Sequence, residues 1–511
     1  MSDNSSKNKR IAKNTVLLYF RMLLIMAVNL YTSRVVLETL GVEDYGIYTA
    51  VGGIVAFFNI ICGSLSAATQ RFITHALGKN DEEHLSCIFS TSVFVHIAMC
   101  VVIFILAETI GLWMLEYKMI IPAGRTVAAM WVYRCSIALS MIMIMSVPYN
   151  ATIIAHERMG AFAAISLVEV FLKLGIVYLL LIGTADKLIL YSILMVAVQL
   201  LIRFCYAHYC IKHFKETKIR FVFDKKLIKE IGAFSTWSLM GNAAFVSYTH
   251  GLNVLLNIFF SPVVNAARGI AVQIQSATNQ FVMNFQTALN PQITKSYAAG
   301  DLQYMHKLVF TSARLSFYLL LILSLPIIIE CETILGVWLT VIPENTALFA
   351  RIILVTSWIH SIANPLITSV KATGKIKIYE CTVGGIMLLI LPISYLFLKL
   401  GYPPYSVFVI SLIMETIAQV FRIWITSRLI SFSIRKFITN VLLRCLVTVL
   451  FAAPIPILLH VKMEQNIGSF IIICTTSVII SFISIYVIGI DKNERTLVNN
   501  KLKQVLVKLK K

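Results

Sequence analysis

Acidic residues are scarce in this chain, and charge of either sign is low. Only 13% of its 511 residues are charged, and 44 Lys and Arg stand against 24 Asp and Glu. A soluble domain has about a quarter of its residues charged, so the composition excludes an ordinary set of soluble domains. The seven aspartates all fall in predicted loops or tails, at positions 3, 44, 81, 186, 224, 301 and 491.

Enzyme and metal motifs are missing too. The sequence has no P-loop GxxxxGKS/T, no GxSxG nucleophile elbow and no HExxH helix. Its ten cysteines are scattered singly, without a CxxC pair or a His/Cys cluster of metal-ligand spacing. We therefore predict a protein that is not an enzyme and that uses no metal or other cofactor.

Long hydrophobic runs, in contrast, fill the chain. Hydrophobic residues make up 58% of it, and most runs reach roughly 20 residues, the length that crosses a bilayer core of about 30 Å. Without a barrel's alternating pattern, such segments must cross as helices, because each backbone amide needs a partner within its own segment. We predict an all-α polytopic membrane protein with about fourteen transmembrane helices. The predicted segments are 14–37, 46–68, 87–112, 127–150, 160–183, 188–209, 231–258, 264–290, 308–329, 347–370, 379–399, 405–427, 437–460 and 468–490.

Basic residues lie mostly on one side of these predicted segments. The N-terminal tail, every second loop and the C-terminal tail hold 29 of the 44 Lys and Arg, whereas the opposite loops hold 5. By the positive-inside rule, both termini are expected in the cytoplasm. Basic loops that face anionic membrane lipids explain the net charge of +20 without nucleic acid. The tail 491–511 is either an amphipathic helix on the membrane surface or a solvated basic tail.

An internal repeat divides the predicted helices into two lobes. The stretch "QRFITHALGKNDEEHL" (70–85) matches "PQITKSYAAGDLQYMHKL" (291–308) at an offset of 220, and "PYNATIIAHERM" (148–159) matches "PLITSVKATGKI" (365–376) at an offset of 217. An offset of six helices predicts two parallel six-helix lobes around a central cleft, with two extra helices at the C-terminus. The expected parts are a basic tail 1–13, an N-terminal lobe 14–209, a basic linker 210–230, a C-terminal lobe 231–427, the extra helices 437–490 and the tail 491–511.

The opening of the first lobe resembles a known family. The stretches "SRVVLETLGVEDYGIYTAVGGIVAFF" and "SAATQRFITHALGKND", with "PVVNAARGIAVQI" and "ATGKIKIYE" in the second lobe, are similar to bacterial polysaccharide flippases. These are the O-antigen-type members of the multidrug/oligosaccharidyl-lipid/polysaccharide exporter superfamily. The resemblance implies a flippase that moves undecaprenyl-pyrophosphate-linked sugar units by alternating access.

Two neighbouring helices carry stripes of polar residues at helical spacing. One stripe, in 264–290, includes Arg268, Gln275 and Asn279, with Val272 and Val282 or Met283 at the intervening steps. The other, in 231–258, includes Asn242 and Asn253. Such side chains avoid lipid, so they either join helices by hydrogen bonds or line a wet lumen suited to sugar hydroxyls. The remaining members of the stripes are Asn265, Gln286, Asn290, Ser235, Ser238, Thr249 and Asn257.

Charges inside the predicted helices suggest further roles. Lys173 either pairs with Glu169, four residues earlier on the same face, or binds substrate. Arg34, Arg134 and Arg268 either reach the head groups or converge on a pyrophosphate, and Arg21 is a similar case. Glu169 and Glu415 are the candidates for ion coupling. The interfacial anchors are expected to be Arg203, Arg314, Arg422 and Arg444.

Together with the resemblance, these observations predict a flippase that carries a lipid-linked anionic oligosaccharide, an O-antigen or capsule repeat unit, from the cytoplasmic to the periplasmic leaflet of the bacterial inner membrane. A peptidoglycan-precursor (lipid II) flippase and a cation-coupled multidrug or metabolite exporter are the alternatives. Expected partners are membrane lipids and the polymerase and glycosyltransferases of the same glycan pathway. The candidate substrate-binding residues are Arg34, Arg268, Lys173, Arg21, Arg134, Gln275, Asn279, Asn242 and Asn253.

Overall fold

The computed structural model confirms an all-α chain over the residues that it describes. These are residues 14–499 except 30, 33–34, 37–38, 42–43, 45–46, 49–50, 52–58, 80, 118–120, 122–123, 183–185, 219–223, 261, 340–341, 465, 492–493 and 497–498. Within them, ten helices are long and apolar enough to cross a membrane. The predicted tail 1–13, residues 500–511 of the predicted tail 491–511, and the candidate Arg34 lie outside the described residues.

The chain divides into two compact units, which agrees with a two-lobed architecture. Unit 1 comprises Met1–Ala243 and Thr287–Asp301, and unit 2 comprises Ala244–Gln286 and Leu302–Lys511. The chain passes from one unit to the other at 243/244 and 286/287, each inside a long helix, and at 301/302, between two helices, whereas the sequence placed the lobe boundary in the linker 210–230. No linker composition marks the two divisions inside helices, because those helices continue through them without a break.

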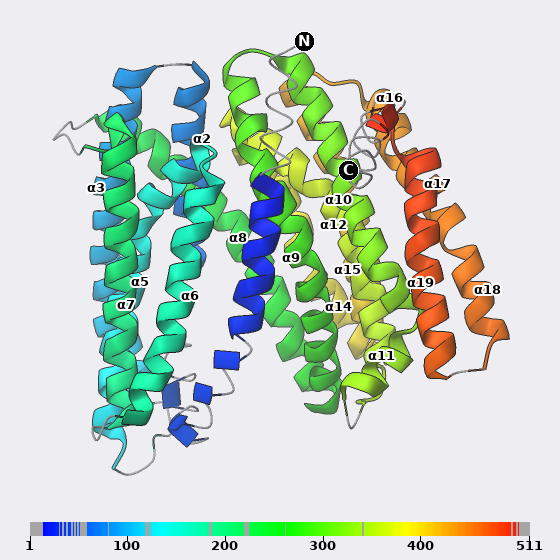
Figure 1. The fold of residues 1–511 in the computed structure, drawn as a ribbon, viewed down its shortest axis with the longest axis horizontal. Helices are drawn as coiled ribbons and strands as arrows, with labels where there is room; N and C mark the ends of the chain where they lie inside the picture. Colours follow the sequence, from blue (N-terminus) through cyan, green and yellow to red (C-terminus); the bar gives the residue numbers. More distant parts are fainter. Residues whose placement is uncertain are drawn as a thin grey trace, which may run out of the picture. The chain divides into compact units, whose positions relative to one another are not determined.

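Unit 1 contains the first helices of the chain (Figure 1). They are Asn14–Asn29, α2 (Asn59–Lys79), α3 (Glu82–Leu106), the π-helical turn η1 (Ala107–Gly111), α4 (Leu112–Tyr117), α5 (Thr126–Ala155), α6 (Met159–Ile182), α7 (Lys187–His213) and the 3-10 turn η2 (Lys215–Thr217). From residue 87 onward, each predicted segment coincides with a helix or with consecutive helices. The end of segment 14–37 and the first part of segment 46–68 fall largely among residues that are not described.

Unit 2 contains the later helices and the two extra spans, drawn from yellow-green to red in Figure 1. They are α10 (Leu302–Ile329), α11 (Cys331–Trp338), α12 (Thr346–Thr373), α13 (Lys377–Leu388), α14 (Ile390–Lys399), α15 (Ser406–Ile430), α16 (Ile434–Phe437), the π turn η3 (Ile438–Leu442), α17 (Leu443–Ala452), α18 (Pro454–Lys462), α19 (Ile467–Ser484) and the π turn η4 (Ile485–Gly489). The extra helices α17 and α19 pack against α10.

Two helices, α8 (Lys225–Phe259) and α9 (Pro262–Ala298), have parts in both units. They are 35 and 37 residues long, or more than about 50 Å at 1.5 Å per residue. Neither is among the ten apolar spans, because the polar stripes lower their hydropathy. The polar stripes therefore set these two helices apart from the ten apolar spans.

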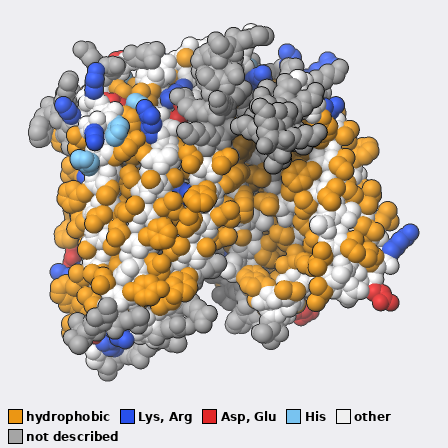
Figure 2. Space-filling model, viewed as in Figure 1, with side chains coloured by type: hydrophobic (Ala, Val, Ile, Leu, Met, Phe, Trp, Pro, Cys, Tyr) orange, Lys and Arg blue, Asp and Glu red, His pale blue; other side chains and the backbone are white. Residues whose placement is uncertain are grey.

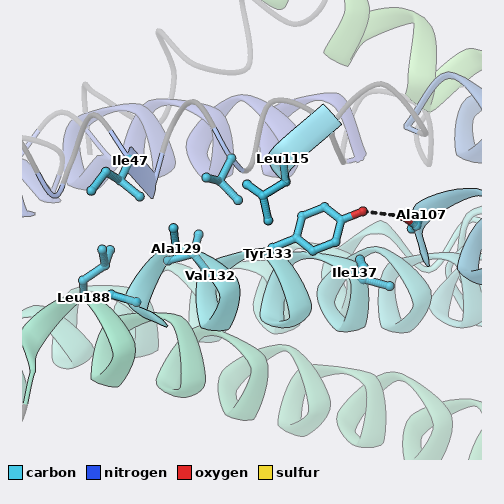
Figure 3. Close-up of a cluster of buried hydrophobic side chains, with 10 residues drawn as sticks. Ile47, Ala107, Leu115, Ala129, Val132, Tyr133, Ile137 and Leu188 are labelled. Carbon is cyan, nitrogen blue, oxygen red and sulfur yellow. Dashed lines mark hydrogen bonds between the residues drawn. The ribbon is translucent and has the colours of Figure 1, made fainter. Parts of the chain in front are cut away.

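A close-packed cluster surrounds the N-terminal part of α5 in unit 1 (Figure 3). Ala129, Val132 and Tyr133 of this helix are at most 1% exposed and pack with Leu115 and Leu188. The hydroxyl of Tyr133 donates to the Ala107 carbonyl at 2.6 Å. That carbonyl begins the π turn, and Gly111 at the end of the turn leaves room for the phenol, since a Cβ there would meet the hydroxyl at 2.2 Å.

Small residues let the helices of unit 2 approach closely. Buried serines recur along α10, α12 and α19, where Ser316, Ser361 and Ser477 are at most 3% exposed. In a membrane, lipid is as apolar as a leucine side chain, so close packing and hydrogen bonds hold helices together more than hydrophobic burial does. On the face shown in Figure 2, hydrophobic side chains cover the middle of the helices, and Lys and Arg gather mainly toward the upper ends.

The repeat seen in the sequence reappears in the backbone. Pro148 and Pro365, which the offset of 217 aligns, both lie inside long helices, α5 and α12. The same offset aligns the residues after these helices, and Glu157 (φ 58°) and Gly374 (φ 78°) both adopt the left-handed conformation. Glycine adopts it freely, whereas a residue with a Cβ rarely does.

Candidate functional site

A cavity of about 570 Å³ lies within unit 2. We call it the unit 2 cavity. Helices α8, α9, α12 and α15 form its walls. Val272, Val282 and Met283 of α9 take part in the lining together with its polar residues, as the predicted stripe requires. The polar lining includes Thr249, Arg268, Gln275, Ser276, Asn279, Thr356, Ser357, His360, Ser361, Asn364, Ser411 and Glu415.

Arg268 supplies the positive charge of the α9 wall. It is 6% exposed, donates to the Thr249 carbonyl at 2.8 Å and also donates to Asn253 Oδ1. Its buried Nε has no hydrogen-bond partner among the described residues. A buried donor without a partner costs about 1–3 kcal/mol, so an anion bound there would gain a donor that the protein leaves open.

The amides of α9 have two different surroundings. Gln275 lines the unit 2 cavity and donates to Ser357 Oγ at 2.8 Å. Gln286 is buried, donates to Ser316 Oγ at 3.0 Å and accepts from Asn364 Nδ2 at 3.0 Å. Gln286 therefore joins helices, whereas Gln275 both bonds to α12 and faces the unit 2 cavity.

Glu415 places a carboxylate on the α15 wall of the unit 2 cavity. Its Oε1 accepts from Arg422 Nη1 at 2.6 Å, and His360 Nδ1 lies 3.2 Å away. Arg422 also donates to the Tyr379 hydroxyl at 3.1 Å and to Gln419 Oε1 at 3.3 Å. Arg422 therefore offsets the charge of Glu415, and Arg268 leaves the group with a net positive charge.

The expectation that Arg422 and Arg314 anchor the helices to head groups is wrong. Arg422 is 3% exposed and Arg314 is 2% exposed, and Arg314 binds both carboxylate oxygens of Glu494 at 2.7 Å. Burial of a guanidinium in hydrocarbon requires an internal partner. Glu415 lies two turns before Arg422 on the same face of α15, a spacing visible in the sequence. Glu494 lies 180 residues from Arg314, and only the packing of the helices brings these two together.

The other two predicted anchors also bond to protein groups. Arg203 donates to the Met145 carbonyl and lies 5.1 Å from the ring centre of Tyr149. Arg444 pairs with Asp491. Both remain partly exposed, so they combine an internal hydrogen bond with access to the surroundings.

The candidate cations of unit 1 do not line the unit 2 cavity. Lys173 forms an ion pair with Glu169 at 2.6 Å along α6. Arg21 donates to Ser166 Oγ at 2.5 Å. Arg134 is exposed on α5.

The stripe along α8 is divided between the two units. Asn242, in unit 1, donates to Ser64 Oγ at 2.9 Å. Asn253, in unit 2, accepts from Arg268, and Thr249 lines the unit 2 cavity. The side chains of Asn257 and Asn265 lie outside the described residues.

Sequence reasoning missed the α12 wall of the unit 2 cavity. Ser357, His360, Ser361 and Asn364 of this helix line it, and their spacing of three, one and three residues keeps them on one helical face. That stripe is shorter and rich in serine, a residue that is common at helix contacts. The described residues contain no group of His, Cys, Asp and Glu that could hold a metal ion.

The protein-family comparison matches more than half of the chain. The family model described as polysaccharide biosynthesis protein aligns with residues 11–297. Among curated proteins, no sequence match was found. The family match confirms the resemblance drawn from the motifs of the first lobe.

Solved transporter structures share the fold at low sequence identity. The crystal structure of MATE in complex with MaD3S has a TM-score of 0.70 and 14% identity, and covers 84% of this chain and 97% of that one. An outward-facing multidrug resistance MATE family transporter of the MOP superfamily has a TM-score of 0.68 and 15% identity, covering 83% and 96%. A MOP superfamily transporter from Pyrococcus furiosus, described as having a binding pocket of reverse polarity, has a TM-score of 0.66 and 15% identity. That match covers 83% of this chain and 96% of that one.

The chain is thus a multi-pass membrane protein with the two-lobed fold of these transporters. It belongs to the family of polysaccharide biosynthesis proteins.

Proposed function

We propose that the protein is a flippase that moves a lipid-linked oligosaccharide from the cytoplasmic to the periplasmic leaflet by alternating access. The family match supports a polysaccharide pathway, and the fold is that of membrane transporters. In this proposal both termini and the Lys- and Arg-rich loops face the cytoplasm. The substrate carries its sugars on undecaprenyl pyrophosphate, an O-antigen or capsule repeat unit.

One observation carries the choice of an anionic substrate. The buried Arg268 lines the unit 2 cavity with an unused Nε donor, while Glu415 opposite has its charge offset by Arg422. Charge-assisted hydrogen bonds to a guanidinium are about twice as strong as neutral ones. Arg268 would bind a phosphate or an acidic sugar, while Gln275 and Asn279 would bind sugar hydroxyls.

The cations of unit 1 are further candidates for binding the pyrophosphate. In this scheme Arg34, Arg21 and Lys173 help to balance the pyrophosphate charge, and Arg134 stays a weaker candidate because it is exposed. Lys173 would have to leave Glu169 to do so. A lipid II flippase uses the same kind of head group. It is distinguished by the phenotype, because its loss removes the cell wall instead of a surface glycan.

A second candidate function is a cation-coupled exporter, and Glu415 is the observation that favours it. This carboxylate lines the unit 2 cavity with His360 beside it, where a proton or Na⁺ could bind. Glu169 of α6 is the other candidate carboxylate for ion coupling. Against this function stands Arg422, whose permanent charge at 2.6 Å competes with any cation for Glu415.

The test compares two arginines of unit 2 in a strain that lacks the chromosomal gene. Arg268→Ala should lower surface glycan by about 10–100-fold at normal protein level, since a charged hydrogen bond contributes about 1.5–3 kcal/mol and 1.4 kcal/mol is tenfold. Arg268→Lys should retain part of the activity.

The matched control is Arg351→Ala. Arg351 also donates to a carbonyl, that of Ile328 at 2.9 Å, and to the carboxylate of Glu332, but it does not line the unit 2 cavity. The Arg351→Ala variant should therefore leave surface glycan near the wild-type level. Full glycan with Arg268→Ala would remove Arg268 from the mechanism, and raised drug susceptibility of the deletion strain with intact glycan would favour the exporter.

A further inference from the structure

The turn between α5 and α6 contains a buried glutamate in a conformation that favours glycine. Glu157 has φ 58°, and Gly374, its counterpart in the second repeat, has φ 78°. The backbone conformation at this position therefore favours glycine, which has no Cβ. A side chain that persists at such a position needs a compensating interaction elsewhere.

The carboxylate of Glu157 has that interaction with the end of α9. Gln292 Nε2 donates to Oε2 at 2.7 Å and Lys295 Nζ donates to Oε1 at 2.8 Å. Asn14 of the first helix donates to the Glu157 carbonyl at 3.2 Å. The side chain is 1% exposed, so both carboxylate oxygens are used by one helix end that lies 135 residues away in the sequence.

The same end of α9 packs tightly on the end of α2. A Cβ on Gly78 would lie 2.6 Å from Ala298 Cβ and 2.8 Å from the Lys295 carbonyl. Gly78 and Ala298 are also equivalent positions of the repeat, because they are 220 residues apart. These two equivalent helix ends therefore meet without space for another side chain.

Helix α9 links this contact to the candidate site. Its segment Thr287–Asp301 belongs to unit 1, whereas its earlier part, with Arg268 and Gln275, lines the unit 2 cavity. An interaction that holds the Thr287–Asp301 end therefore acts on the same helix, α9, that carries the proposed substrate-binding residues Arg268 and Gln275.

We propose that Glu157 is a latch that holds the cytoplasmic end of α9 closed against the α5–α6 turn and the end of α2, and that transport requires this latch to open. The closing role stands on the contacts alone. The requirement for opening rests on the proposed transport function, in which the substrate enters from the cytoplasm.

The first experiment measures how tightly the end of α9 is held. Ser296, which is 7% exposed, is replaced by cysteine in an otherwise cysteine-free full-length chain, and a membrane-impermeant maleimide is added to inside-out vesicles. Glu157→Gly should raise the labelling rate several-fold, although glycine suits the turn and keeps it folded. Lys295→Met should do the same. The charge exchange Glu157→Lys with Lys295→Glu should lower the rate again.

The second experiment asks whether the end of α9 has to move. Lys79→Cys and Ala299→Cys, next to the Gly78–Ala298 contact, leave Glu157 and Lys295 intact and can be joined by a short bis-maleimide. Joining them should stop export of surface glycan. The control is the double variant Lys212→Cys, Lys215→Cys, whose two positions are exposed and lie three residues apart in the sequence. The same reagent joins neighbouring residues there without linking α2 to α9, and this protein should stay active.

Unchanged labelling in Glu157→Gly would overturn the latch, whatever transport does. Undiminished transport by the joined Lys79→Cys, Ala299→Cys protein would show a static contact and would overturn the requirement for opening. The labelling experiment involves no substrate, so failure of the proposed transport function alone would leave its result standing.

Discussion

Removing the guanidinium of Arg422 should destabilise unit 2 much more than removing that of Arg351. Both arginines pair with a glutamate of the same unit. The Arg422–Glu415 pair has side chains 4% and 7% exposed, whereas the Arg351–Glu332 pair has 34% and 54%. The two variants, Arg422→Met and Arg351→Met, therefore differ mainly in burial.

The structure sets the expected sizes. Arg422→Met loses hydrogen bonds to Glu415, Tyr379 and Gln419 and leaves a buried carboxylate without its cation, which costs about 3–5 kcal/mol. An exposed ion pair contributes about 0–1 kcal/mol, and the bond from Arg351 to the Ile328 carbonyl adds about 1 kcal/mol. The free energies of unfolding should therefore differ by about 1–4 kcal/mol between the variants.

Equilibrium unfolding by SDS in mixed micelles, followed by circular dichroism, measures the difference. Glu415→Gln added to Arg422→Met should recover part of the loss, because an amide replaces the uncompensated anion. Equal destabilisation by Arg422→Met and Arg351→Met would refute the reasoning. A double variant less stable than Arg422→Met alone would refute it as well.

Two further perturbations test the end of unit 1 that carries the latch. Gly78→Ala gains up to about 1 kcal/mol in helix propensity but forces a methyl to 2.8 Å from the Lys295 carbonyl, an overpacking cost of about 1–3 kcal/mol, so its melting temperature should fall. Gly232→Ala, with nothing within 4 Å, is the control and should not fall. Burial is the largest influence on Glu216 and would raise its pKa, but the hydrogen bond with His156, a backbone hydrogen bond and the charge of His156 together hold that pKa below its ordinary value of 4.5. The stabilisation is present above pH 4.5 and is lost as the pH falls through the lower folded-state pKa. Melting curves of Glu216→Gln should therefore depend less on pH below 4.5 than those of the wild type, and equal slopes would contradict this.

The membrane architecture was predictable because it depends on local properties. A run of about 20 apolar residues forms a spanning helix whatever its neighbours are, and the segments from 87 onward agree with the helices that the structure describes. The repeat was predictable for the same reason, because equivalent prolines and turn residues keep their local roles. Pro148 with Pro365, and Glu157 with Gly374, show this in the backbone.

The candidate site was predictable only in part. The α9 stripe, with Arg268 and Gln275, identified one wall of the unit 2 cavity, since helical spacing alone decides which residues share a face. The partners of those residues were not predictable. His360 and Arg422 both meet Glu415, but one lies on a different helix and the other was expected at the lipid surface.

By itself, the sequence determined that this chain crosses the membrane many times as helices, in two related halves, with its basic loops predicted to face the cytoplasm. Those properties follow from hydropathy, helical period and charge, which are summed along the chain. The tertiary structure decided which buried charges are neutralised, which amide joins helices and which faces a cavity, and why Glu157 occupies a glycine-like turn. Several of these outcomes depend on residues far apart in the sequence, such as Glu157 and Lys295, that come together only when the helices pack.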